Sequence, residues 1–274
     1  MRTRAKSAFI MAPLLIIIFL GGYFLIAGVF ALSLITIREY SAAFGDRKPS
    51  GWAMITSLII LYTGFLIPAL KTPWFIILWV FVSLVLCFIS MFAMEKYDLL
   101  QGMATITGVF YINFLAFHII LVDDLFSKAL PVGSIWFSGF NSYVWIIVLA
   151  AFGTDIFAYF TGKVFGRHKL CPSISPKKTV EGSVGGIIGS VILCGIFGWF
   201  LIPGGFVNCI IIGVAGSIIS QVGDLSASVM KRKIGIKDWG TLIPGHGGVL
   251  DRIDSMLFTA PLVFYFLVLK EVVF

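Results

Sequence analysis

Charged residues are scarce in this sequence: they make up 12% of its 274 residues, whereas soluble domains carry about 25%. This scarcity excludes a disordered chain and a charged coiled coil. Apolar residues make up 59% of the chain, and the mean hydropathy is +1.04. Such a composition indicates a protein that resides in a lipid bilayer.

Cysteine is also scarce. The four cysteines are widely spaced, and no two of them form a Cys-x-x-Cys pair. We therefore expect neither a disulfide framework nor a zinc site. The chain begins with a basic segment, as a signal peptide does, but no small-residue cleavage site follows and the apolar run continues beyond the length of an h-region. This pattern predicts a retained first span.

Continuous apolar runs of about 20 residues predict helices, because the strands of a membrane barrel alternate in polarity. The runs lie at residues 8–20, 22–37, 52–70, 73–94, 101–121, 142–161, 183–202, 206–222 and 255–269. The first two form either one long tilted helix or a helical pair broken near Gly21 and Gly22. We predict an all-α polytopic membrane protein with about nine transmembrane helices, in which residues 1–274 form a single membrane domain.

The distribution of lysine and arginine decides between these two arrangements. With a helical pair, 17 of the 20 basic residues fall on one side of the membrane; with a single first helix, the best division is 14 to 6. The positive-inside rule therefore predicts the pair, with the N-terminus in the cytoplasm and the C-terminus outside. The three outer residues are then Lys71, Lys128 and Lys270. The cytoplasmic residues are Arg2, Arg4, Lys6, Arg38, Arg47, Lys48, Lys96, Lys163, Arg167, Lys169, Lys177, Lys178, Lys231, Arg232, Lys233, Lys237 and Arg252.

The net charge of +7 is thus a basic cytoplasmic face, which attracts anionic lipid head groups or phosphorylated substrates. Many proteins of the inner membrane are basic on this side. Here, however, ten of the 20 basic residues lie between Lys163 and Arg252, in two predicted loops at residues 163–182 and 223–254. We therefore separate a less specific helical part, residues 1–150, from a candidate catalytic part, residues 151–274, whose motifs are described below, and expect no nucleic-acid partner.

Asp155 interrupts the apolar run at residues 142–161. A charge at the centre of a span costs about 2.5–3.5 kcal/mol, so this side chain must face the bundle interior or water. Tyr159 follows one helical turn later on the same face. A buried structural ion pair would also account for Asp155, but a functional role is the better interpretation.

The next segment combines lysines with hydroxyl groups. Ser175, Lys177 and Lys178 surround Pro176, and together they form a candidate clamp for phosphate oxygens. Glycines then follow at positions 182, 185, 186 and 189, a spacing that predicts close helix packing. The chain has no Walker motif, so any nucleotide is bound in another way.

The segment from Gln221 to Asp254 is the most specific. It brings three carboxylates, several cations, a histidine and a glycine turn to the membrane surface. Asp251 and Asp254 are three residues apart and share one face at the start of a helix. Carboxylates that hold Mg²⁺ beside cations that hold phosphate are typical of phosphoryl or nucleotidyl transfer. The pattern predicts a magnesium nucleotide site, and the alternative is a structural network of acid and base pairs.

From Ser228 to Asp254 the chain reads S-x-M-K-R-x4-K-D-x-G-x2-I-P-x-H-G-G-V-x-D-R-I-D, which resembles the signature of phosphatidate cytidylyltransferases, the CDP-diacylglycerol synthases. Two upstream motifs, D-x-x-A-Y-x-x-G-K from Asp155 and S-P-K-K-T-x-E-G from Ser175, resemble the same family. Residues 1–150 resemble it only in hydropathy. Ala227 departs from the pattern, because many members of the family carry glutamate there.

The resemblance implies that CTP and phosphatidic acid give CDP-diacylglycerol and pyrophosphate with Mg²⁺ and, in some form, a second cation. It implies a catalytic site on the cytoplasmic side of the inner membrane. The implied metal ligands are Asp224 and Asp251, with Asp254 and Asp155 as weaker candidates. The other implied catalytic residues are Lys231, Arg232 and His246. The implied substrate-binding residues are Lys177, Lys178, Ser175, Lys237, Arg252, Tyr159 and Ser228.

Two other functions would use residues of the same kinds. A CTP-dependent lipid kinase, such as a polyprenol kinase, would use similar metal and phosphate groups on an alcohol acceptor. An anion transporter would use the basic face as a vestibule, but it would need paired charges on both faces or midway through the bilayer. The glycine spacing permits tight helix contact within one chain or in a homodimer, and the sequence leaves this choice open.

Overall fold

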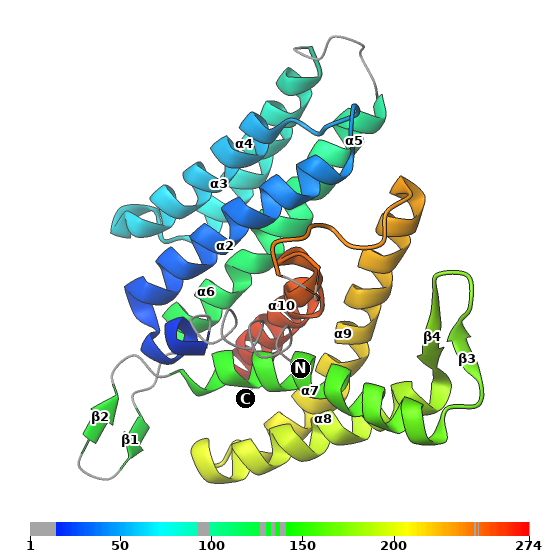
Figure 1. Ribbon diagram of the computed structural model, residues 1–274. Helices are drawn as coiled ribbons and strands as arrows, with labels where there is room; N and C mark the ends of the chain where they lie inside the picture. The colour runs from blue at the N-terminus through cyan, green and yellow to red at the C-terminus, as the bar shows by residue number, and fades with distance from the viewer. Residues whose placement is uncertain are drawn as a thin grey trace.

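The computed structural model describes residues 15–92, 99–126, 130–132, 135–137, 141–243, 245 and 247–273. Figure 1 shows a helical bundle with two small hairpins at its edges. The helices are α2 (Gly22–Ala43), α3 (Gly51–Leu66), α4 (Pro73–Phe92), α5 (Leu99–Gly108), α6 (Leu115–Phe126), α7 (Ser142–Phe165), α8 (Val180–Leu201), α9 (Phe206–Ile234) and α10 (Leu250–Val273). Shorter elements are η1 (Pro68–Leu70), the π-helical turn η2 (Val109–Phe114), and the antiparallel pairs β1 (Leu130–Val132) with β2 (Ile135–Phe137) and β3 (Lys169–Cys171) with β4 (Ser175–Thr179).

Seven helical segments within the described residues are long and apolar enough to cross a membrane, and Gly51–Leu66 is a shorter apolar helix. One of the seven, Leu99–Leu125, runs without interruption through α5, η2 and α6. The predicted fold class, an all-α polytopic membrane protein, is confirmed. The total of nine stays a prediction, because most of the first predicted span lies outside the described residues.

The predicted break in the first apolar region is present. Residues 15–20 are helical, and Gly21 and Gly22 then adopt φ angles of 59° and 53°, which glycine tolerates best. The chain folds back on itself, because a Cβ atom on Gly28 would lie 2.4 Å from the side chain of Ile17. The backbone N–H of Gly22 donates to Asp123 Oδ2 at 2.8 Å, near the C-terminal end of α6.

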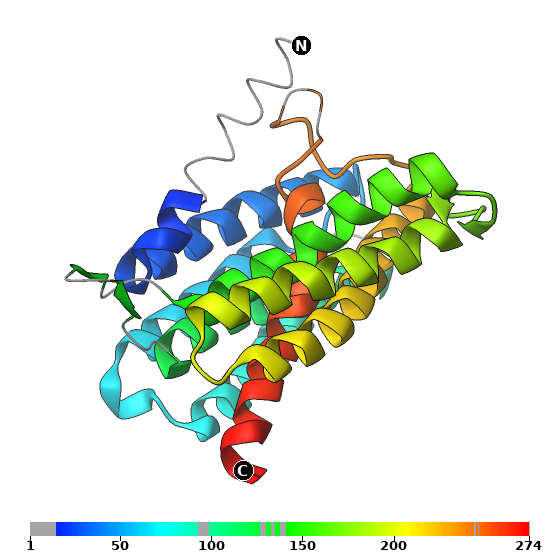
Figure 2. The same cartoon turned by 90° about the horizontal axis from the view of Figure 1, so that it is seen from below.

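The helices connect at two ends of the bundle. We call the end formed by residues 44–50, 166–179 and 235–249 the basic end, since ten of the 17 residues predicted to be cytoplasmic lie between Lys163 and Arg252. At the opposite end, Lys71 Nζ pairs with Asp124 Oδ1 at 2.7 Å. Figure 2 shows the C-terminus at the end opposite to the loop that precedes α10. The positive-inside rule would place the basic end in the cytoplasm, and this orientation stays a prediction.

Helix α10 runs through the middle of the bundle and packs against α6, α7 and α9 (Figure 1). Buried hydrogen bonds tie other helices together: Tyr40 Oη donates to the carbonyl of Ala104 at 3.0 Å, and Trp79 Nε1 donates to that of Ser57 at 2.9 Å. Such bonds hold helices together in lipid, where apolar side chains gain little by leaving one apolar medium for another.

Glycines join α8 to α7. A Cβ atom on Gly182 would lie 2.8 Å from the carbonyl oxygen of Ala158, and one on Gly186 would lie 2.9 Å from that of Thr154. Gly185 and Gly189 face Thr161 and Phe157 in the same way. The predicted glycine stripe is therefore a packing surface within one chain.

Helix α9 extends beyond the apolar run that predicted it. The run ends at residue 222, but the helix continues to Ile234 and is closed by Gly235 at φ 83°. Its last turn carries Lys231, Arg232 and Lys233, where cations are favoured by the helix dipole. The loop predicted at residues 223–254 is therefore wrong in its bounds: residues 223–234 are helical and α10 begins at Leu250, which leaves residues 235–249 as the loop.

Candidate active site

A cavity of about 540 Å³ opens at the basic end, between α7, β4, α8, α9 and α10. Both Asp224 and Asp251 line it, so the two principal predicted carboxylates belong to one site. The charged residues of its lining are Asp155, Asp224, Asp238, Asp251 and Asp254, together with Lys163, Lys177, Lys178, Lys231 and Arg252. The cavity thus combines five carboxylates with five cations, as a site for phosphates and a metal ion requires.

Three of these carboxylates come from three different helices. Asp155 lies on α7, Asp224 on α9 and Asp254 on α10. The Oγ of Ser255 lies 3.2 Å from Asp155 Oδ2 and 3.3 Å from Asp254 Oδ1 and links these two side chains. Helices α9 and α10 approach closely here, since a Cβ atom on Gly223 would lie 2.9 Å from the carbonyl oxygen of Asp254. All three side chains line the same cavity, so they form one cluster of carboxylates.

The β3–β4 hairpin brings a lysine to this cluster. Lys178 on β4 forms an ion pair with Asp224. The hairpin is fastened to the start of α8, because Thr179 Oγ1 accepts the N–H of Gly182 at 3.1 Å and Glu181 accepts the backbone N–H groups of Arg167 and His168 at 3.0 and 3.2 Å. These contacts position Lys178 over the cavity.

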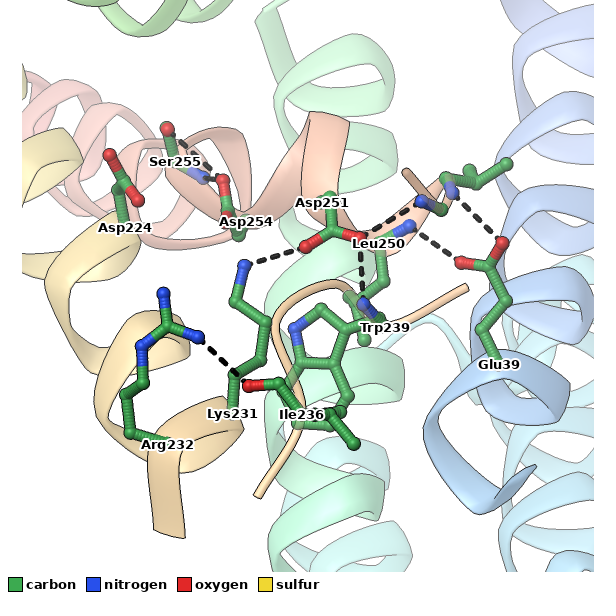
Figure 3. A network of polar contacts seen from close by, with 12 residues as sticks. Glu39, Asp224, Lys231, Arg232, Ile236, Trp239, Leu250, Asp251, Asp254 and Ser255 are labelled. Carbon is green, nitrogen blue, oxygen red and sulfur yellow. Dashed lines mark hydrogen bonds and ion pairs between the residues drawn. The ribbon is translucent and has the colours of Figure 1, made fainter. Parts of the chain in front are cut away.

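Asp251 is enclosed by donors (Figure 3). Its Oδ1 accepts from Lys231 Nζ at 2.6 Å, and its Oδ2 accepts from the backbone N–H groups of Trp239 and Gly248 at 2.8 and 2.9 Å. The side chains of Lys231 and Asp251 are only 10% and 3% exposed. Asp251 therefore holds the loop before α10 in place as well as lining the cavity.

Other cations of the lining carry no carboxylate partner among the described residues. Lys163 and Lys177 form no ion pair there, and neither does Arg252, whose Nε is buried without a hydrogen-bond partner. Cations of this kind are able to bind an anionic ligand directly.

Some predicted residues lie elsewhere. Arg232 donates to the backbone carbonyls of Ile236 at 2.9 Å and Ile174 at 3.4 Å and does not line the cavity. Ser175, Ser228 and Lys237 are also absent from the lining. Tyr159 lines it, although its side chain is largely exposed. His246 lies outside the described residues, so its role stays a prediction.

Sequence reasoning did not assign several residues of the lining to the site. Asp238 lies in the motif from Ser228 to Asp254, and Lys163 ends the motif that begins at Asp155. Their spacing in the sequence does not indicate that their side chains point into the cavity. Ser183 and Gln221 face each other through a hydrogen bond between α8 and α9. Such uncharged residues within apolar runs give no sequence signal that distinguishes a site from helix packing.

Among the described residues, no three His, Cys, Asp or Glu side chains stand close enough to enclose a metal ion by themselves. Mg²⁺, however, is commonly held by one or two carboxylates together with substrate phosphates and water. Asp224, with Asp155 and Asp254 in the lining of the same cavity, offers oxygen ligands of this kind. The residues of the cavity therefore fit a magnesium ion bound together with a phosphorylated substrate.

The fold and the cavity define a helical membrane protein whose polar site suits phosphate chemistry. Residues 2–270 match the model of the Cytidylyltransferase family, and the chain belongs to that family. It is 34% identical to a phosphatidate cytidylyltransferase of Synechocystis over 92% of this chain and 91% of that protein. Proteins of the same name from Bacillus subtilis and Haemophilus influenzae are 42% and 48% identical, over 47% and 45% of this chain and 48% and 44% of their own lengths.

Proposed function

We propose that this protein condenses CTP with phosphatidic acid to give CDP-diacylglycerol and pyrophosphate. One observation carries the proposal: residues from the three motifs, separated by up to about 100 positions, line a single cavity that contains both carboxylates and unpaired cations. The family and the names of its relatives support the same reaction.

The reaction needs no nucleophile from the protein. A phosphate oxygen of the lipid attacks the α-phosphorus of CTP, a new P–O–P linkage forms, and the bond to the β-phosphate breaks, so that pyrophosphate leaves. The lipid phosphate is already an anion near neutral pH, because the second pKa of a phosphate monoester is about 6. The main obstacle is therefore repulsion between two anions, which positioned cations reduce.

We assign this work to the cations of the cavity. Lys163, Lys177 and Arg252 have no ion-pair partner among the described residues and are available for phosphate oxygens. Lys178 forms its ion pair with Asp224 at the same cavity, so it is placed to bind phosphate next to that carboxylate. The charge of Lys231 is neutralised by Asp251. We therefore assign Lys231 to holding the Asp251 side chain in place and not to binding phosphate.

Magnesium fits the acidic cluster, and we propose that Asp224 holds it, with Asp254 and Asp155 nearby. When bound, the ion neutralises charge on the phosphates. The predicted contribution of Asp251 as a metal ligand and the presence of a second cation stay predictions. Asp251 already accepts three hydrogen bonds, so a metal ion there would compete with Lys231 and with two backbone groups.

The position of the cavity suits both substrates. We propose that the basic end faces the cytoplasm of a bacterial inner membrane, where CTP arrives from water and phosphatidate from the inner leaflet. Tyr159, Phe160 and Val164 expose large apolar surfaces near the cavity on α7, as lipid-facing residues do. A homodimer also stays a prediction, since the glycine stripe packs within one chain.

The direct test incubates the purified protein in detergent with Mg²⁺, phosphatidic acid and CTP labelled at its α-phosphate. We expect a labelled liponucleotide and unlabelled pyrophosphate. A parallel reaction with polyprenol and γ-labelled CTP tests the kinase alternative. Labelled polyprenyl phosphate, or no liponucleotide from phosphatidic acid, would contradict the proposal.

Asp224→Asn tests the site with a matched control. We expect turnover to fall by about 100-fold or more, because the variant removes a charge that positions phosphates and metal. Asp124→Asn removes an aspartate from a similar lysine pair at the opposite end, and its turnover should equal that of the wild type. Equal losses in the two variants would show that Asp224 matters only for folding.

A further inference from the structure

Glu39 lies near the C-terminal end of α2, far in sequence from the motifs of the site. Its side chain is buried, with a residue exposure of 9%. Its Oε1 accepts the backbone N–H of Val249 at 3.0 Å, and its Oε2 accepts that of Leu250 at 2.9 Å. Figure 3 shows the carboxylate facing the start of α10. The first N–H groups of a helix lack partners within the helix, and Glu39 supplies partners from another helix.

The loop before α10 closely surrounds this carboxylate. A Cβ atom on Gly240 would lie 2.6 Å from Glu39 Oε1, and one on Gly248 would lie 2.5 Å from Oε2. Any side chain at either position would therefore collide with Glu39. The backbone of the loop is able to approach both carboxylate oxygens of Glu39 because Gly240 and Gly248 have no side chain.

Glu39 and Asp251 bind the same loop from opposite sides. Asp251 accepts the N–H groups of Trp239 and Gly248, while Glu39 accepts those of the next two residues, Val249 and Leu250. The two acids thus fix four backbone N–H groups in the segment that leads into Asp251, and Leu250 directly precedes this aspartate.

From this arrangement we propose that Glu39 is a positioning residue for the reaction: it fixes the N-terminus of α10 and thereby the placement of Asp251 and its partner Lys231. The proposal rests on the proposed function for its kinetic consequence. It assigns a role in the site to the N-terminal part of the chain. The sequence alone related this part to the family only by hydropathy, but the family match begins at residue 2 and includes it.

Glu39 forms no ion pair among the described residues, so backbone donors alone hold it. Glutamine has the same shape, but it offers one acceptor oxygen and places an NH₂ group where the second N–H needs an acceptor. Glu39→Gln should therefore release one side of the loop without creating a cavity. Glu39→Asp keeps the charge and both acceptor oxygens, but its side chain is one methylene shorter. We therefore expect it to retain part of the wild-type hold on the loop.

Tyr40→Phe is the matched control. The neighbouring Tyr40 is also buried on α2, and its hydroxyl donates to Ala104 on α5. Phenylalanine removes this bond between helices but keeps the ring beside Trp239, whose centroid lies 5.3 Å away. The control thus loses a buried hydrogen bond from the same helix without releasing the start of α10.

The experiment measures turnover, the KM for CTP, and backbone hydrogen exchange across residues 239–251, each at a temperature where the variant is folded. For Glu39→Gln we expect kcat to fall by about 10- to 100-fold, the KM for CTP to stay within about twofold, and exchange in residues 239–251 to become faster. Glu39→Asp should lie between Glu39→Gln and the wild type. Tyr40→Phe should match the wild type in kcat and in the exchange of this segment.

Wild-type turnover or wild-type exchange in Glu39→Gln would overturn the proposal, as would equal losses of kcat in Glu39→Gln and Tyr40→Phe. If Glu39→Gln does not fold, Glu39→Asp carries the test with the same expected direction. Failure of the wild type to use CTP and phosphatidic acid would instead contradict the proposed function, and the exchange comparison would still test the hold of Glu39 on α10.

Discussion

At the scale of single residues, the pair of Lys231 and Asp251 shows how the site combines stability with chemistry. Both side chains are nearly inaccessible, and Asp251 also holds two backbone N–H groups. Breaking a buried pair by removing one charge leaves the other unpaired, which costs about 3–5 kcal/mol. We therefore expect the loss of this aspartate to reduce the stability of the fold as well as the proposed reaction.

Asp251→Asn should lower the melting temperature of the purified protein and abolish turnover. The double variant Asp251→Asn with Lys231→Met removes the stranded cation and should recover much of the lost stability, but no turnover. Thermal unfolding in detergent and the liponucleotide assay measure the two effects separately. Recovery of activity in the double variant would show that neither side chain acts in the reaction.

At the scale of elements, the packing of α8 against α7 determines one wall of the cavity. Gly182 belongs both to the glycine stripe and to the cavity lining. The atom nearest to a Cβ there is the backbone carbonyl oxygen of Ala158, which is unable to move without moving α7. A methyl group at Gly182 should therefore push α7 and α8 apart beside the cavity.

Gly182→Ala should destabilise the protein by about 1–3 kcal/mol and reduce turnover. Gly195→Ala, on the same helix, is the control: its Cβ would meet other atoms only at 3.5 Å and beyond, an ordinary contact, and it should leave both quantities unchanged. Unfolding curves and turnover for the two variants provide the comparison. A similar effect from both would mean that glycine is needed in α8 for a reason other than close contact.

The bounds of the helices show how much of the fold hydropathy could predict. Hydropathy located the ends of the described spans other than α9 to within six residues, since a span must be apolar where it meets lipid. It missed the end of α9, because a helix that lines a polar cavity carries Asp224 and Lys231 within its helical length. The spacing of Asp251 and Asp254 predicted that they share one face, and both line the cavity. The sequence offered no partner for Glu39, since its hydrogen bonds go to backbone groups about 210 residues away.

At the scale of the whole molecule, the bundle has a basic end and an opposite end, and the basic residues predict that the basic end is cytoplasmic. The turn at Gly21 and Gly22 lies beside Asp123, at the end opposite to the cavity, so the fold-back is required for the predicted alternation of loops. Among the cysteines, Cys87, Cys194 and Cys209 are fully buried, while Cys171 on the β3–β4 hairpin is half-buried. Cys171 is thus a native cysteine at the basic end that a thiol reagent should be able to reach.

A membrane-impermeant maleimide should label Cys171 in inverted membrane vesicles and not in right-side-out vesicles, if the basic end is cytoplasmic. Cys171→Ser should abolish this labelling. Adding Asp124→Cys to the Cys171→Ser variant places a thiol at the opposite end and should reverse the pattern. Labelling of Cys171 in right-side-out vesicles would contradict the orientation.

The contact between Glu39 and α10 has a consequence for biosynthesis. Glu39 is translated early, but the two backbone N–H groups that it accepts lie about 210 residues later, near the end of the chain. The buried surroundings of this carboxylate are therefore complete only after α10 has been synthesised and has packed. A chain that ends before α10 should leave Glu39 accessible to solvent, in contrast to its buried position in the folded protein.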